Sequence, residues 1–259
     1  MNRRWEFTDL EFFALWEGTQ DGVLPSPFFF TSDIPLYRDF LAAKQHALQR
    51  LRDRLGYTAD DLLGIMTRPD LRIAVRGTNE ENPRLRIRLL AVRRADRGLL
   101  ISQQPGETLE DSGGFTVVEQ HASELPRMIV SGLPTAPAGK RGEVVLTDIA
   151  EHAADYDYTY SRPVHRAADD EVQRSAGEFR RVDTDSVGMI DICQGVSVFG
   201  PSGISRYRSG WRDLAGDGRY LVTPGPPAVA TPVDRRRMVE ALDRVIADVL
   251  RTMKDEPVR

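Results

Sequence analysis

The spacing of apolar residues near the start of the chain is helical. Thr8 and Glu11 stand three apart, as in a capping box, and apolar residues follow at helical intervals, so a first helix is expected to about Glu17. A longer helix is expected after Ser32-Asp33, because apolar residues recur along one face until Gly56, a plausible stop. A third, shorter helix is predicted over 59–66.

From residue 71 the apolar period changes to strict alternation. Leu71, Ile73 and Val75 alternate with polar or small residues, and the stretch 84–89 repeats this pattern. The alternation predicts two half-buried strands, with apolar side chains on one sheet face and arginines on the other. The arginines are Arg72, Arg76, Arg84, Arg86 and Arg88. The polar stretch Gly77 to Pro83 is expected to be the loop between these strands. A turn at Asp96-Arg97-Gly98, strands over 99–103 and 115–119 and a helix through 125–129 would complete an antiparallel meander.

The second half repeats this order of elements after a stretch with weaker signals. One or two helices are expected between 149 and 179, around the tyrosine-rich stretch 155–160, and no role is assigned to 136–185. Strands are predicted at 189–192, 204–211, 219–223 and near 229. The final helix is expected to begin with Thr231 as its N-cap and Pro232 at its first position, and it carries a single apolar stripe through Leu250.

These elements predict the α+β class, with a central twisted antiparallel β-sheet flanked by N-terminal and C-terminal helical groups. The turns Asp96-Arg97-Gly98 and Asp217-Gly218-Arg219 occupy matching places in the two halves. We therefore expect one domain over 1–259, with a pseudo-twofold internal repeat whose halves are approximately 1–134 and 135–259.

Composition indicates a cytoplasmic globular protein. The chain has 259 residues, enough to bury a sizeable core, and its net charge is −4. Cys193 is the only cysteine, so no intrachain disulfide can form. No apolar run is long enough for a membrane span, and the N-terminus lacks the apolar run of a signal peptide.

Motifs for catalysis, metals and cofactors are lacking. The four histidines, His46, His121, His152 and His165, have no second His or Cys at metal-ligand spacing. There is no phosphate loop or nucleophile elbow, and Cys193 lies in an apolar strand where a thiol is usually an inert packing group. We expect no catalytic residues, no metal site and no cofactor.

The arginine-bearing strands allow a second hypothesis, a nucleic-acid-binding module, because arginines on a sheet face can grip phosphates. Stacking aromatics are missing from these strands and the chain as a whole is acidic, which favours an internal role. The acidic residues Asp169, Asp170, Glu171 and Glu178 are expected to lie across the arginines. An enzyme whose site is unpatterned in sequence also stays open.

Several segments resemble the EspG family of ESX (type VII) secretion chaperones. At the N-terminus they are Trp5 to Leu15, Leu24-Pro25 and Phe40-Leu41. At the C-terminus they are Trp211-Arg212-Asp213, then Gly218-Arg219-Tyr220-Leu221, then a closing helix entered through Thr231-Pro232. The segment from Ala136 to Asp185 does not align with the family pattern, and the loop from Gly77 looks short.

The resemblance implies a cytosolic chaperone that is not an enzyme. Such a protein binds a PE/PPE-type heterodimer at the apolar tip of the PPE subunit, keeps it soluble and directs it to its secretion system. The family uses its central sheet, the loop between its second and third strands and its C-terminal helical group. Carried over, the loop residues are Gly77, Thr78, Asn79, Glu80, Glu81 and Asn82. We expect no nucleic-acid partner and no membrane insertion, and keep a weak homodimer as a further partner.

Overall fold

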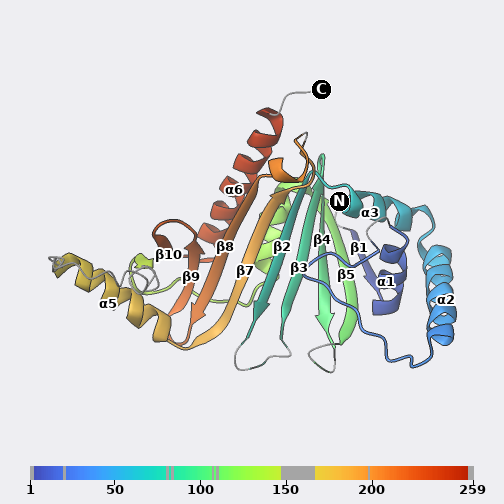
Figure 1. Cartoon of the computed structure of the whole chain (residues 1–259), viewed down its shortest axis with the longest axis horizontal. Coiled ribbons are helices and arrows are strands. Elements are labelled where there is room, and N and C mark those ends of the chain that lie inside the picture. Colours follow the sequence, from blue (N-terminus) through green and yellow to red (C-terminus); the bar gives the residue numbers. More distant parts are fainter. Residues whose placement is uncertain are drawn as a thin grey trace, which may run out of the picture.

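The computed structural model describes residues 3–19, 22–79, 82, 85–106, 108, 111–146, 167–197 and 199–255. Its strands are β1 (Arg3–Phe7), β2 (Leu71–Thr78), β3 (Ile87–Arg94), β4 (Arg97–Pro105), β5 (Ser112–His121), β6 (Val144–Leu146), β7 (Thr184–Gln194), β8 (Arg206–Leu214), β9 (Gly218–Thr223) and β10 (Ala228–Pro232). Its α-helices are α1 (Asp9–Glu17), α2 (Tyr37–Leu55), α3 (Tyr57–Thr67), α4 (Leu125–Ser131), α5 (Ala167–Arg181) and α6 (Arg235–Asp255). The strands form one antiparallel sheet in the order β1-β5-β4-β3-β2-β7-β8-β9-β10-β6, so the predicted α+β class is confirmed (Figure 1).

The two halves of the chain meet where β2 pairs with β7. Ile73 lies opposite Ile192 and Val75 opposite Ile190, and the pairing runs the full length of β2. Outward from this junction the order is β3, β4, β5, β1 on one side and β8, β9, β10, β6 on the other. An internal repeat would produce this order, although the repeat and the halves 1–134 and 135–259 stay predictions.

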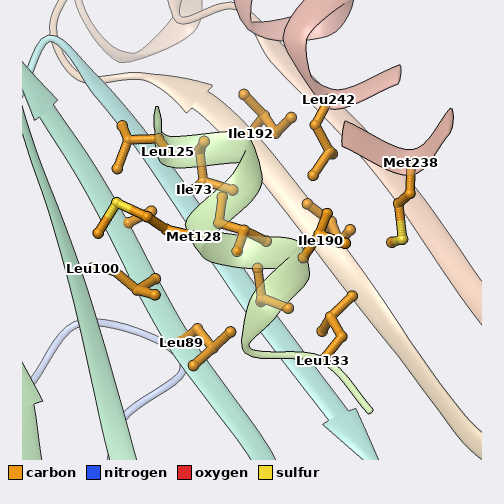
Figure 2. Packing of buried hydrophobic residues seen from close by; sticks show 14 of the residues in the cluster. Ile73, Leu89, Leu100, Leu125, Met128, Leu133, Ile190, Ile192, Met238 and Leu242 are labelled. Carbon is orange, nitrogen blue, oxygen red and sulfur yellow. The ribbon is translucent and has the colours of Figure 1, made fainter. Parts of the chain in front are cut away.

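Helices α4 and α6 cover one face of the sheet over this junction, which we call the α4/α6 face. Figure 2 shows Ile73, Leu89 and Leu100 of the strands beneath Leu125 and Met128 of α4. Ile190, Ile192, Met238 and Leu242 continue the same buried cluster toward α6. Because residues from both halves share this cluster, neither half can bury its apolar surface alone.

The opposite face, which we call the α3/α5 face, is covered by helices on both sides of the sheet but not over the strands between them. Near β1 the helices α1–α3 pack on it, with Leu62 and Met66 of α3 in one cluster with Leu90 and Val92 of β3 (Figure 1). At the other end Phe179 of α5 packs against Tyr220 with ring centroids 5.1 Å apart. No described helix covers the strands between these two groups on this face, and these strands carry the candidate site described below.

The predicted helix termini are largely confirmed, with one correction. The Thr8 and Glu11 side chains cap each other's backbone N–H groups, and Gly56 ends α2 with a positive φ of 52°. The cap of the last helix is Asp234, not Thr231, since its carboxylate accepts the backbone N–H of Arg237 at 2.7 Å. Thr231 and Pro232 still pair with β9, so they belong to strand β10.

The strand predictions need two corrections. Strand β3 starts at Ile87, later than expected, and its stretch from Leu89 to Val92 is buried on both faces because α3 packs on one side and α4 on the other. The short edge strands β1 and β6 were not predicted, since so few residues show no clear period. Of the helices expected over 149–179, α5 is present, while the stretch 155–160 lies outside the described residues.

The C-terminal family motif is explained by packing on the α4/α6 face. The fully buried Trp211 ring lies against two glycines, Gly77 of β2 and Gly188 of β7, and its Nε1–H donates to the Ser186 hydroxyl at 3.3 Å. A Cβ atom on Gly188 would come within 2.1 Å of the ring and 2.4 Å of the Arg76 carbonyl oxygen. Because neither glycine has a side chain, the Trp211 ring packs directly on the backbones of β2 and β7 and so links both strands to β8.

Asp213 and Arg219 of the same motif form a buried ion pair. Two guanidinium nitrogens donate to the two carboxylate oxygens at 2.6 and 2.7 Å, and both side chains are at most 4% exposed. Arg219 Nη2 also donates to the Pro134 carbonyl at 2.7 Å, so the pair holds the segment that leads from α4 toward β6. At Gly218, φ is +147° and the Ala138 backbone would lie 2.6 Å from any Cβ, which explains the glycine.

Replacing Gly188 with alanine is expected to destabilise the fold by about 2 kcal/mol, because the added methyl group must displace the Trp211 ring or the β2 backbone. Urea unfolding followed by tryptophan fluorescence measures the change. Gly142→Ala is the matched control, because nothing lies within 4 Å of its Cβ position, and it should shift stability by no more than ~0.5 kcal/mol. Equal effects of the two variants would contradict the packing role.

Asp213→Asn and Arg219→Gln are each expected to cost about 3 kcal/mol, since each leaves a buried partner without its counter-charge. The double variant should lose at least ~1 kcal/mol less than the sum of the singles. Urea unfolding of all four proteins gives this coupling, and strictly additive losses would argue against it. The exposed pair Arg236–Glu240 is the control, where Glu240→Ala should change stability by less than ~0.5 kcal/mol.

Candidate partner-binding surface

The predicted loop residues are divided between a strand and a loop. Gly77 and Thr78 are the last residues of β2, so they were wrongly placed in the loop, which spans 79–86. Asn79 and Asn82 do lie in it, and the Asn79 side-chain oxygen accepts the Asn82 backbone N–H at 2.8 Å. Glu80 and Glu81 lie outside the described residues.

A hollow of about 650 Å³ lies at the base of this loop, on the α3/α5 face, and we call it the arginine hollow. Its floor is made by the end of β2, the start of β3 and the facing part of β7, and one wall is the segment 24–28 that precedes α2. Three arginines line it together with apolar residues. They are Arg76, Arg86 and Arg88, with Leu24, Pro27, Phe28, Ile87, Val187 and Met189.

The three arginines of the hollow lack acidic partners in the part of the chain that the structure describes. Arg76 donates weakly to the Met189 sulfur at 3.5 Å, and the Arg88 guanidinium lies 4.0 Å from the centre of the Phe29 ring. The Arg86 Nε–H is buried without a described hydrogen-bond partner. Burial, and secondly the charge of Arg86, lowers the pKa of Arg88 below its usual value, although an arginine stays protonated at neutral pH.

Sequence reasoning missed the N-terminal wall of this hollow. Strands β2 and β3 contribute no aromatic side chain that stacks on an arginine, as expected. The ring that stacks on Arg88 is Phe29, which belongs to the connection between α1 and α2. The run Phe28-Phe29-Phe30 after Pro27 was a signal that this connection packs on the sheet. Only the tertiary structure could show which arginine it meets.

The positive charge continues from the hollow across the centre of the sheet. Register places Arg76 opposite Arg88, and Arg72 and Arg206 on either side of Cys193, all on the α3/α5 face. Arg208 lies on this face too and pairs with Asp191. The arginine face therefore extends over β8, whose alternating arginines were a signal not used in the prediction, while Arg84 lies outside the described residues.

The acidic stretch expected to cover these arginines does not do so. It belongs to α5, which packs against β6 and inserts Phe179 beside Tyr220 and Leu214, at the far end of the sheet. Glu171 and Glu178 are exposed, and Asp169 and Asp170 lie where side chains are not described. The expectation was wrong because the apolar side of α5 decides its position, and surface charges contribute too little to override that burial.

A second hollow, of about 710 Å³, lies on the opposite face between α6 and strands β8 and β9. Apolar and aliphatic surface from Tyr207, Leu221 and Val245 lines its inner part, and burial raises the pKa of Tyr207. The Ser209 hydroxyl is buried at its base with no hydrogen-bond partner in the described residues. Charged residues of α6 form the rim. We call this the α6 groove.

The described residues contain no group of three or more His, Cys, Asp or Glu side chains placed to hold a metal ion. Burial, as the largest effect, raises the pKa of the Cys193 thiol and so disfavours the reactive thiolate. Within the same ranges, no helix is long and apolar enough to cross a bilayer.

Fold and surface together define an α+β protein with a broad, partly uncovered sheet and two shallow hollows near its centre. The family model described as the EspG family matches residues 8–244, and the chain therefore belongs to the EspG family. The suggested resemblance of the N-terminal and C-terminal motifs is thereby confirmed, and the match also spans the segment 136–185.

A solved structure shares this fold along both chains. It is the type VII secretion system chaperone EspG5 of Mycobacterium tuberculosis in complex with a PE25–PPE41 dimer, which matches with a TM-score of 0.54 and 12% sequence identity. The match covers 100% of this chain and 99% of that one. At this identity the likeness shows the fold. The comparison with curated protein sequences finds no match.

Proposed function

We propose that this chain is a type VII secretion chaperone of the cytoplasm, which binds a PE/PPE-type heterodimer and keeps it soluble until secretion. The observation that carries this proposal is family membership over residues 8–244, together with a fold shared end to end with a chaperone solved on such a dimer.

The contact is proposed to be the apolar tip of the PPE subunit. The surfaces that suit it are the uncovered sheet centre, the β2–β3 loop with Asn79 and Asn82, and the α6 groove. The α6 groove offers the apolar lining that such a tip requires, through Tyr207, Leu221 and Val245. A complex that survives purification is expected to bury about 1,600 Å² in total. Covering the tip would prevent the partner pair from associating with itself.

Co-expression tests this function directly. The chain is expected to co-elute in size-exclusion chromatography with a PE/PPE pair encoded in the same genome, as one complex with equal amounts of the three chains. An unrelated helical dimer of similar length serves as the control partner and should elute separately. Failure to co-elute with any such pair encoded nearby would count against the chaperone function.

Replacing Asn79-Glu80-Glu81-Asn82 with a Gly/Ser stretch is expected to leave folding intact and to weaken capture of the PE/PPE pair by about tenfold, a loss of about 1.4 kcal/mol. Calorimetry measures the affinity, and thermal unfolding checks the fold. The matched control is the β4–β5 connection, where Glu107 to Glu110 are replaced in the same way, so that two carboxylates are lost in each variant. Equal affinity of the loop variant and the unmodified chain would remove the loop from the interface.

A further inference from the structure

The arginine hollow combines positive charge with apolar surface in one concave site. Arg76, Arg86 and Arg88 line it from β2, from the residue preceding β3 and from β3, and Pro27, Phe28 and Met189 form much of the remaining wall. Its volume of about 650 Å³ lies within the range of roughly 300–1,000 Å³ typical of ligand sites. A hollow of this kind fits a ligand that is itself both anionic and apolar.

The charge of the hollow is not balanced by the residues that the structure describes. No described carboxylate forms an ion pair with Arg76, Arg86 or Arg88, whereas Arg208 on the same sheet face forms an ion pair with Asp191. The buried Nε–H of Arg86 also has no acceptor in these residues. A buried donor without a partner is costly, and an acceptor brought by a ligand would remove that cost.

We propose that the arginine hollow binds an acidic segment of the secreted partner, with Arg76 and Arg86 donating hydrogen bonds to one or more of its carboxylates and a neighbouring apolar side chain packing on Met189 and Phe28. Arginine suits this role because its planar guanidinium donates two parallel hydrogen bonds to a carboxylate. Arg88 adds positive charge to the hollow but is not assigned a carboxylate, since the Phe29 ring already covers one side of its guanidinium. The identity of the partner rests on the proposed function.

Other anionic ligands fit the site less well. A membrane surface is broad and cannot enter a recess that is bounded by the segment 24–28. Single-stranded nucleic acid is usually bound by a basic groove that offers several aromatic rings for base stacking. In this hollow the Phe29 ring is already covered by Arg88, so it does not offer that face to a base. The net charge of the chain, −4, also disfavours a nucleic-acid ligand. The hollow also adjoins the β2–β3 loop, where a protein partner is expected.

Fluorescence anisotropy with a labelled hexapeptide of glutamate and leucine tests the hollow without any PE/PPE pair. The unmodified chain should bind this peptide at least about tenfold more tightly than the same peptide with glutamine in place of glutamate. The variant R76Q/R86Q should lose that preference, and higher salt should weaken binding in the unmodified chain only. R50Q/R52Q is the matched control, because it removes two exposed charges of α2, and it should bind as the unmodified chain does.

Calorimetry with a purified PE/PPE pair is the second arm. R76Q/R86Q should weaken capture by about tenfold, with R76E/R86E weaker still, while thermal unfolding shows that the variants fold. If the unmodified chain captures a pair and R76Q/R86Q captures it equally well, the inference is overturned and the proposed function stands. If no pair is captured, the proposed function fails and the peptide arm alone decides the inference. Tighter binding of a short oligothymidine than of the acidic peptide would also overturn it.

Discussion

The pairing of β2 with β7 is the constraint on which the rest of the structure depends. These strands come from opposite halves of the chain, and their ladder is the only link between two groups of strands in the described sheet. Ile73 and Ile192 meet across it and are sealed beneath α4 and α6. Burial of this shared cluster stabilises the junction, and the junction in turn sets the distance between the helical groups on the opposite face.

The residues that carry the C-terminal resemblance are explained by this architecture. Trp211 needs the glycines of β2 and β7 beneath its ring, and Asp213 with Arg219 fixes the segment after α4 through the Pro134 carbonyl. The side chains of Trp211, Asp213 and Arg219 are buried on the α4/α6 face, whereas Gly77 and Gly188 also border the arginine hollow on the other face. Trp211, Asp213 and Arg219 of this motif thus maintain the fold, whereas Leu221 of the same motif also lines the α6 groove.

The uncovered strip of the α3/α5 face follows from the same geometry. Helices α1–α3 pack over β1, β5, β4 and β3, and α5 packs toward β6 and β9, because their apolar partners, such as Leu90 and Tyr220, lie on those strands. The central strands are left with arginines whose stems cover the sheet and whose charges face solvent or the hollow.

The sequence by itself determined the α+β class, the helix with its Thr8 cap, the alternation in β2 and the apolar stripe of α6, because each of these depends on contacts close along the chain. Only the tertiary structure decided that β3 is buried on both faces, that Phe29 covers Arg88 and that α5 packs beside β6 and Tyr220, not over the arginines of β2 and β3. These features depend on which distant segments compete for the same apolar surface. Local periodicity carries no information about that competition, since it is decided by the total area buried.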